Sequence, residues 1–277
     1  MSDTAGKPGS EGNGGPQKPG PAQPQVLQVD IQTRFGRLRG NLPVPSAGMR
    51  LSELAWNAMA LDERMIGMAV ASEAKQGRQV ACQKGCGACC RQAVPVTPAE
   101  AWMLADVVAS FPADRKAKVL GRFAAARDRL AQEGFGDRSL SGTATESDVL
   151  ALGLDYFRLG IPCPFLEEES CSIHPHRPSS CREYLVTSPA AHCSRPGELP
   201  ISAVPLATSL TEGLSKLSAM VLDTEPHVIP MTLALEWAAE HGEEGRRRYD
   251  GAFLLGALVE LLGAPGRNQA PDPSCEI

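Results

Sequence analysis

Eight of the nine cysteines in the sequence lie in two segments, and thiols gathered in such numbers can chelate metal. The first segment places four thiols within nine residues, at Cys82, Cys86, Cys89 and Cys90. Two glycines stand between these thiols, and glycine permits the tight turns that bring several sulfurs to one metal ion. The spacing therefore predicts a metal-binding loop.

The second segment holds four further cysteines, Cys163, Cys171, Cys181 and Cys193. Their spacing is too irregular for a zinc-finger knuckle, so we expect the fold to bring these thiols together. Eight thiols suit two four-thiolate sites, or one site plus a group of structural or redox thiols. Zinc and iron are both candidates, the iron as a single ion or an iron–sulfur cluster, because all-sulfur ligands suit either metal.

Several polar side chains accompany the second segment, namely His174, His176, Arg177, Arg182 and Tyr184. We expect the two histidines to contact the sulfurs or to lie at the surface rather than to bind metal, because the thiols already suffice. The two arginines are expected to offset the negative charge of metal-bound thiolates, and Tyr184 is grouped with them as a neighbour of the sulfurs.

These motifs together resemble the YkgJ-type cysteine-cluster family, which is described as a zinc- or iron-chelating domain. The resemblance covers residues 82–193 and rests on Cys82-x3-Cys86-x2-Cys89-Cys90, Cys163-Pro164-Phe165-Leu166, Cys171-Ser172-Ile173-His174, Arg177-Pro178 and Cys181-Arg182-x-Tyr184. It implies metal chelation. Some relatives are lysine N-methylases acting on flagellin, in which a similar cluster looks like an iron–sulfur site. An iron–sulfur enzyme or accessory factor for protein side-chain modification is therefore the alternative function.

Two other functions fit parts of the first segment. Cys82, Cys86 and Cys89 have the spacing of radical S-adenosylmethionine enzymes, but Ala88 replaces the usual aromatic residue and the chain lacks a repeated strand–helix pattern. The adjacent thiols of Cys89 and Cys90 could form a redox switch that releases metal on oxidation. Thiols without metal are disfavoured, because closely held thiolates would repel one another.

Composition limits the partners and the location. The chain has 277 residues and a net charge of −5, so it has no overall positive field to attract nucleic acid or an anionic membrane. The N-terminus lacks the apolar stretch of a secretory signal. We therefore expect a cytoplasmic protein with reduced thiols, whose partner is a metal ion. The helices after residue 200 either form a surface that binds a further protein or a second copy of the chain, or only complete the core.

Hydrophobic periodicity predicts a mainly α fold with Cys-rich metal-binding loops and an N-terminal strand or hairpin. Alternating apolar residues over 27–35 predict the strand, with Gly36, Gly40 and Asn41 as turn residues. Helical spacing predicts helices at 51–68, 98–111, 114–133, 147–159, 206–222, 230–241 and 246–262. The expected organisation is a disordered leader (1–25), a metal-binding domain (26–200), helices packed on it (201–262) and a flexible tail (263–277), with Cys275 uninvolved in metal binding.

Overall fold

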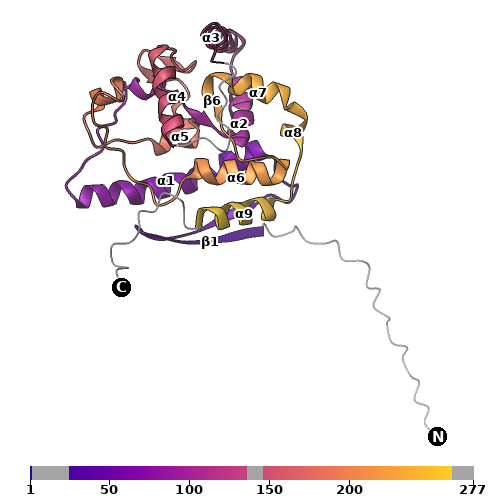
Figure 1. The fold of residues 1–277 in the computed structure, drawn as a ribbon. Coiled ribbons are helices and arrows are strands. Elements are labelled where there is room, and N and C mark those ends of the chain that lie inside the picture. The colour runs from indigo at the N-terminus through magenta and orange to yellow at the C-terminus, as the bar shows by residue number, and fades with distance from the viewer. Residues whose placement is uncertain (2–24, 136–145, 264–277) are drawn as a thin grey trace.

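The computed structural model describes residues 25–135 and 146–263, together with Met1. The expected tail beyond residue 263, Cys275 and nearly all of the expected leader lie outside the described residues. Within these bounds the mainly α fold is confirmed, as Figure 1 shows. The helices are α1 (Leu51–Lys75), α2 (Pro98–Ala109), α3 (Ala113–Gln132), α4 (Glu146–Arg158), α5 (Ser179–Glu183), α6 (Leu210–Leu222), α7 (Ala234–Glu240), α8 (Gly242–Arg246) and α9 (Gly251–Gly263).

Short elements connect these helices. The 3-10 helices are η1 (Ala88–Arg91), η2 (His174–His176), η3 (Ala190–Ser194) and η4 (Met231–Leu233). The two-residue strands β3 (Pro95–Val96) and β6 (Ile229–Pro230) pair antiparallel, and so do β4 (Leu166–Glu167) and β5 (Ser170–Cys171). Most of these short elements were not predicted, because elements of two to five residues show no hydrophobic period.

The N-terminal hairpin is confirmed. Strand β1 (Gln25–Thr33) pairs antiparallel with β2 (Gly36–Val44), and the turn between them consists of residues 34 and 35. Gly36 follows this turn with a φ of 126°, a conformation that side chains with a Cβ rarely adopt. The predicted turn residues Gly40 and Asn41 lie inside β2 instead. The alternating face buries Val29, Ile31 and Leu38, and β1 packs along α9 (Figure 1).

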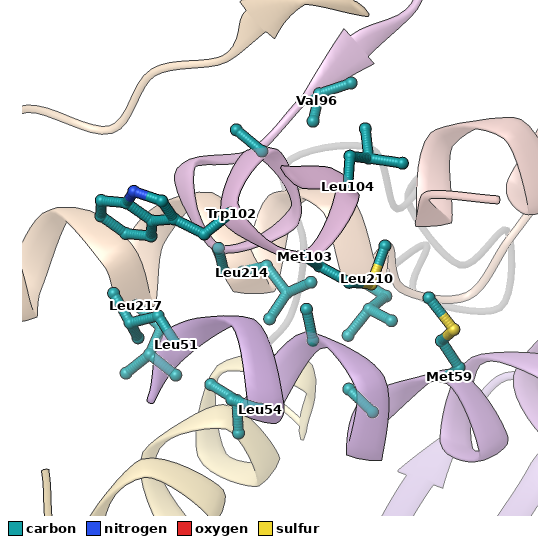
Figure 2. Close-up of a cluster of buried hydrophobic side chains, with 14 of the residues drawn as sticks. Leu51, Leu54, Met59, Val96, Trp102, Met103, Leu104, Leu210, Leu214 and Leu217 are labelled. Atoms are coloured by element: carbon teal, nitrogen blue, oxygen red, sulfur yellow. The ribbon is translucent and has the colours of Figure 1, made fainter. Parts of the chain in front are cut away.

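One hydrophobic core joins the hairpin, α1, α2, α6 and α9. In Figure 2 the side chain of Leu51 from α1 lies beside Leu217 of α6, while Leu54 of α1 points toward α9. All of these side chains are almost completely buried. This core contains residues from both of the expected segments 26–200 and 201–262, and the division between them stays a prediction.

Two helix boundaries differ from the predictions, the end of α1 and the start of α9. Helix α1 continues to Lys75, beyond the last apolar residue of its predicted stripe, and Arg78 folds back to bind Glu73 in its last turn. Helix α9 begins at Gly251 rather than at 246, because Tyr249 instead pairs with Met49 through two backbone hydrogen bonds of 2.8 and 2.9 Å. Local backbone pairing thus overrode the helical pattern.

The predicted start of α2 is confirmed. Thr97 caps the helix by accepting a hydrogen bond from the backbone of Glu100, while the Glu100 carboxylate accepts one from the Thr97 backbone. At the other side of the helix, the indole of Trp102 donates to the His241 carbonyl at 3.1 Å. This bond fixes the Trp102 ring against α7 and α8. Within the described residues, no helix combines the length and apolar character needed to cross a membrane.

We expect Gly245→Ala to destabilise the protein by about 1 to 3 kcal/mol, the usual range for overpacking. An added Cβ at Gly245 would lie 2.5 to 2.8 Å from atoms of the Trp102 ring, which its hydrogen bond holds in place. Gly256→Ala is the matched control, because its Cβ would meet nothing within 4 Å inside α9, and should stabilise by up to about 1 kcal/mol. Urea unfolding measures both. Equal effects would contradict this packing.

Candidate metal centre

All eight described cysteines line a single cavity of about 890 Å³. They are free thiols, and they come from the η1 loop, from β5, from α5, from η3 and from the segments before η1 and β4. These segments gather on one side of α1 and α2, near α4 and α5 in Figure 1. The fold therefore brings together two sets of thiols that are far apart in sequence.

The first segment is shaped by its glycines. Gly85 has a φ of 88°, which turns the chain between Cys82 and Cys86. Gly87 lies so close to the other segment that a Cβ there would stand 2.6 Å from a carboxylate oxygen of Glu169. The two small residues thus allow both the tight turn and the approach of the neighbouring hairpin.

The β4–β5 hairpin carries Cys171 and docks on the first segment. Its two-residue turn consists of Glu168 and Glu169, both with positive φ, of 47° and 57°. This backbone conformation costs roughly 1 kcal/mol per residue when a Cβ is present. Glu169 offsets the cost by binding Arg91 of η1 through two hydrogen bonds of 2.6 and 2.9 Å.

Backbone hydrogen bonds join the two segments directly. The Cys163 amide donates to the Cys90 carbonyl at 2.7 Å, and the Ala81 amide donates to the Val186 carbonyl at 2.8 Å. Helix η1 also packs against η3, which carries Cys193. Thiols of both segments therefore face the same space.

The buried carboxyl group of Glu100 and the half-buried one of Glu183 fix the second segment to the helical core. Glu100 of α2 accepts hydrogen bonds from the amide and the hydroxyl of Ser179, at 2.6 and 2.7 Å. Glu183, at the end of α5, accepts from the Leu210 amide and from the hydroxyls of Ser209 and Thr211, at the N-terminus of α6. A carboxylate at a helix N-terminus is favourable, because it meets unpaired amides and the positive end of the helix dipole. Helix α5 is therefore attached to the core at both ends.

Backbone amides also aim at several of the sulfurs. The amides of Phe165 and Leu166 act to lower the pKa of the Cys163 thiol, and the amide of Ile173 acts to lower the pKa of the Cys171 thiol. The Cys82 sulfur accepts from the Val186 amide. Such hydrogen bonds favour a charged sulfur over a neutral one, and they orient the side chain. Amides near the sulfurs would therefore favour the thiolate form that binds metal.

Burial acts in the opposite direction on most of these thiols. It raises the pKa of the Cys163 thiol to about 12, and it raises the pKa of Cys181 well above its usual range. Cys89 differs, since the thiol of Cys90 donates a hydrogen bond to its sulfur and lowers the pKa of Cys89 to about 6. Most thiols are thus protonated at neutral pH without metal, and a metal must displace their protons on binding.

The arginines and Tyr184 take different positions. Arg177 lines the cavity and interacts electrostatically with Cys82, Cys89 and Cys171, and its buried Nε has no hydrogen-bond partner among the described residues. Arg182 instead donates to the Glu63 carboxylate and to the carbonyls of residues 175 and 177, so it holds the loop against α1. The Tyr184 hydroxyl donates to the Cys193 sulfur.

The two histidines of η2 have different surroundings. His174 lines the cavity, and most of its side chain is exposed. The pKa of His174 is lowered, first by partial loss of solvent around the ring and then by the positive charges of Arg177 and Arg182. His176 packs edge-on against Trp56, with ring centroids 4.9 Å apart, and its Nδ1 is buried without a partner in the described part of the chain.

The donor set fits zinc or iron in its chemistry. Eight thiols face one cavity, and three of them already accept backbone amides, as metal-bound sulfurs do. Over residues 25–135 and 146–263, however, no three Cys, His, Asp or Glu groups stand close enough to hold an ion as they are. Binding therefore requires the thiol side chains to rotate toward one another.

The thiol-lined cavity lies within the one segment of the chain that matches a known family. Residues 81–196 match a family model named CxxCxxCC and described as a putative zinc- or iron-chelating domain. The match covers less than half of the chain, and it confirms the recognition of this segment from its cysteine motifs. The match supports metal binding by this segment in general terms, with zinc or iron as the metal. No curated protein and no solved structure matches the chain.

The sequence analysis did not identify three acidic residues near the cavity as part of the site: Asp62, Glu100 and Glu183, the last of which lines it. Asp62 of α1 is 1% exposed, and neither of its carboxylate oxygens has a hydrogen-bond partner among the described residues. Glu100 was identified only as a helix cap, and Glu183 was not noted at all. A carboxylate on the apolar face of α1, four residues after Ala58, was the available signal for Asp62.

We expect Asp62 to contribute a free energy of folding that decreases as pH rises from about 4 to 8. The Asp62→Asn variant should lack this pH-dependent contribution. Burial, the nearby Glu183 and other carboxylates raise the pKa of Asp62 from 3.8 to about 8 despite Arg182. The folded state therefore holds a proton that the unfolded state releases in this range, which costs stability with increasing pH. Urea unfolding of both proteins at pH 5 and pH 8 should show their difference change by on the order of 3 kcal/mol. A constant difference would contradict this protonation.

We expect Glu100→Gln to destabilise the protein by about 2 to 4 kcal/mol, because an amide cannot accept all the hydrogen bonds that Thr97 and Ser179 donate. Glu236→Gln is the control, since its ion pair with Arg127 is exposed and should contribute less than about 1 kcal/mol. Thermal unfolding measures both, and thiol alkylation should be faster in the Glu100 variant. Equal alkylation rates would show that Ser179 is held by other contacts.

Proposed function

We propose that this protein chelates zinc or iron through the eight thiols of its cavity, in a structural, metal-handling or redox role. The observation that carries the proposal is that all eight thiols, from two distant segments, line one cavity. Four backbone amides aimed at three of the sulfurs support it further, because they stabilise thiolates that a metal would bind.

The metal would stabilise the loops around the cavity. These loops have only 3-10 turns and two-residue strands of their own, so little regular backbone hydrogen bonding orders them. Metal bound by several loops lowers the free energy of the folded state relative to the unfolded chain. The carboxyl groups of Glu100 and Glu183 would keep the second segment in place while metal binds or leaves.

We expect the double variant Cys86→Ser, Cys89→Ser to bind less metal and to melt about 5 to 15 °C lower than the parent, since lost metal contacts of a few kcal/mol shift a protein of this size by that amount. Cys275→Ser is the matched control and should change neither. Elemental analysis and thermal unfolding of anaerobically purified protein give both values. Full metal content with an unchanged melting temperature would refute the proposal.

An iron–sulfur enzyme or accessory factor for protein side-chain modification, such as lysine N-methylation, is the second candidate. The volume of the cavity favours it, because about 890 Å³ is far larger than a single ion and falls in the range of small-molecule pockets, about 300 to 1,000 Å³. Iron and acid-labile sulfide in anaerobically purified protein, followed by reductive cleavage of S-adenosylmethionine, would support it. A colourless zinc protein without sulfide would exclude it.

The other expectations from the sequence stay predictions. They are a cytoplasmic location, a protein partner for the C-terminal helices, and no binding to nucleic acid or membranes. A thiol set of this kind needs a reducing compartment to stay free, which supports the expected location.

A further inference from the structure

The β4–β5 hairpin separates the cysteine cavity from a second, smaller hollow. Glu169, Ser170 and Cys171 of this hairpin line the cysteine cavity. The second hollow, of about 640 Å³, is lined by the same hairpin and its neighbours: Arg122, Leu166, Glu167, Glu168, Ser170 and Ser172. A movement of the hairpin would therefore join the two hollows and open the cysteine cavity on that side.

The base of the hairpin is fixed in the helical core. Phe165, directly before β4, is completely buried and meets Phe123 of α3 with ring centroids 5.3 Å apart. Ile173, two residues after β5, is buried as well. Between them, the carbonyl of Ser172 accepts a hydrogen bond from Arg115 of α3 at 2.8 Å. The two ends of the hairpin therefore stay where they are unless the core itself opens.

The tip of the hairpin is less well supported. Its strands have two residues each, and a two-stranded hairpin alone is only marginally stable. Both turn residues, Glu168 and Glu169, have a positive φ, which disfavours residues with a Cβ. A backbone in such a conformation keeps its shape only where neighbouring groups hold it. The position of the tip therefore depends on what binds it.

Arg91 of η1 binds the tip. Its guanidinium donates two hydrogen bonds to the Glu169 carboxylate, at 2.6 and 2.9 Å, and one to the carbonyl of Gly87 at 3.0 Å. Over residues 25–135 and 146–263, no other side chain forms a hydrogen bond with Glu169. Arg91 directly follows Cys90, and Cys171 lies two residues after Glu169. One ion pair thus joins the two segments that carry the thiols.

We propose that the β4–β5 hairpin is a gate of the cysteine cavity and that the ion pair between Arg91 and Glu169 is its latch. The gate presupposes the proposed function, because the solute that it admits is the metal ion, and it adds the route by which that ion enters and leaves. When the latch opens, the tip moves away from Gly87 while the buried base acts as the hinge. Gly87 permits the closed position, since a Cβ there would stand 2.9 Å from the Leu166 side chain.

The latch is accessible to dissolved ions. The side chains of Arg91 and Glu169 are 35% and 53% exposed, so salt screens the attraction between them. Metal exchange should therefore become faster as the ionic strength rises. A variant without the ion pair should lack this part of the salt dependence.

The test measures the rates of zinc uptake and release by the full chain under anaerobic conditions, with release followed by transfer to a chromogenic chelator. Glu169→Gln removes the charge and keeps the length of the side chain. We expect it to take up and release zinc about 3 to 10 times faster than the parent, with unchanged affinity. Glu167→Gln is the matched control, because Glu167 belongs to the same hairpin but binds Arg122 of α3 at 2.7 Å, beside the second hollow. Its rates should equal those of the parent.

Two further measurements do not depend on a single variant. Arg91→Gln removes the same ion pair from its other side, so the double variant should exchange zinc no faster than either single variant. Alkylation of Cys171 by iodoacetamide in the metal-free protein should be about 3 to 10 times faster in Glu169→Gln than in the parent. Raising potassium chloride from about 0.05 to 0.5 M should accelerate exchange in the parent and not in Glu169→Gln. Circular dichroism identifies any variant that has lost its helices.

The outcomes separate the gate from the function that it serves. Equal rates in the parent and Glu169→Gln, or single-variant effects that multiply in the double variant, would overturn the latch while leaving chelation intact. Faster release with unchanged uptake would also overturn the gate, because the ion pair would then contribute to affinity only. A parent that binds neither zinc nor iron would contradict the proposed function, and alkylation of Cys171 would still decide whether the latch controls access to the cavity.

Discussion

The cysteine cavity depends on two carboxyl groups, of the buried Glu100 and the half-buried Glu183, that attach a loop-rich segment to a helical core. Glu100 accepts hydrogen bonds from Ser179, the first residue of α5. Glu183, the last residue of α5, accepts hydrogen bonds from the N-terminus of α6. Because Cys181 lies between these contacts, its position follows from α2 and α6 rather than from the loops. The hydrogen bonds of these two carboxyl groups therefore help to place the thiols.

The thiols themselves combine two opposing effects. Burial disfavours thiolate charge, while backbone amides and the guanidinium of Arg177 favour it. In the absence of a cation burial dominates for most of them, so repulsion among thiolates is not a reason for the cluster to require metal. Neutral thiols can stay close together, and a divalent ion changes the balance by displacing their protons.

The sequence predicted the long helices and the hairpin well, because their apolar residues recur with a clear period. Val119, Phe123, Ala126 and Leu130 of α3 are both the predicted stripe and the buried residues of that helix. The site was less predictable. The motifs of the site identified the thiols. The contacts that join the two segments, between Cys90 and Cys163 and between Cys82 and Val186, depend on the tertiary fold and could not be predicted from spacing. The roles of Asp62 and Glu183 likewise depend on which helices surround them, which no local spacing encodes.

The contact between the hairpin and α9 sets an order for folding on the ribosome. The buried face of β1 and β2 packs against a helix that ends at Gly263, more than two hundred residues later. At about 5 to 20 residues per second, translation leaves Val29 and Ile31 without this cover for roughly 12 to 46 seconds. The hairpin therefore emerges early but acquires its native environment late, and during that interval its apolar face is a site where chaperones can bind the nascent chain.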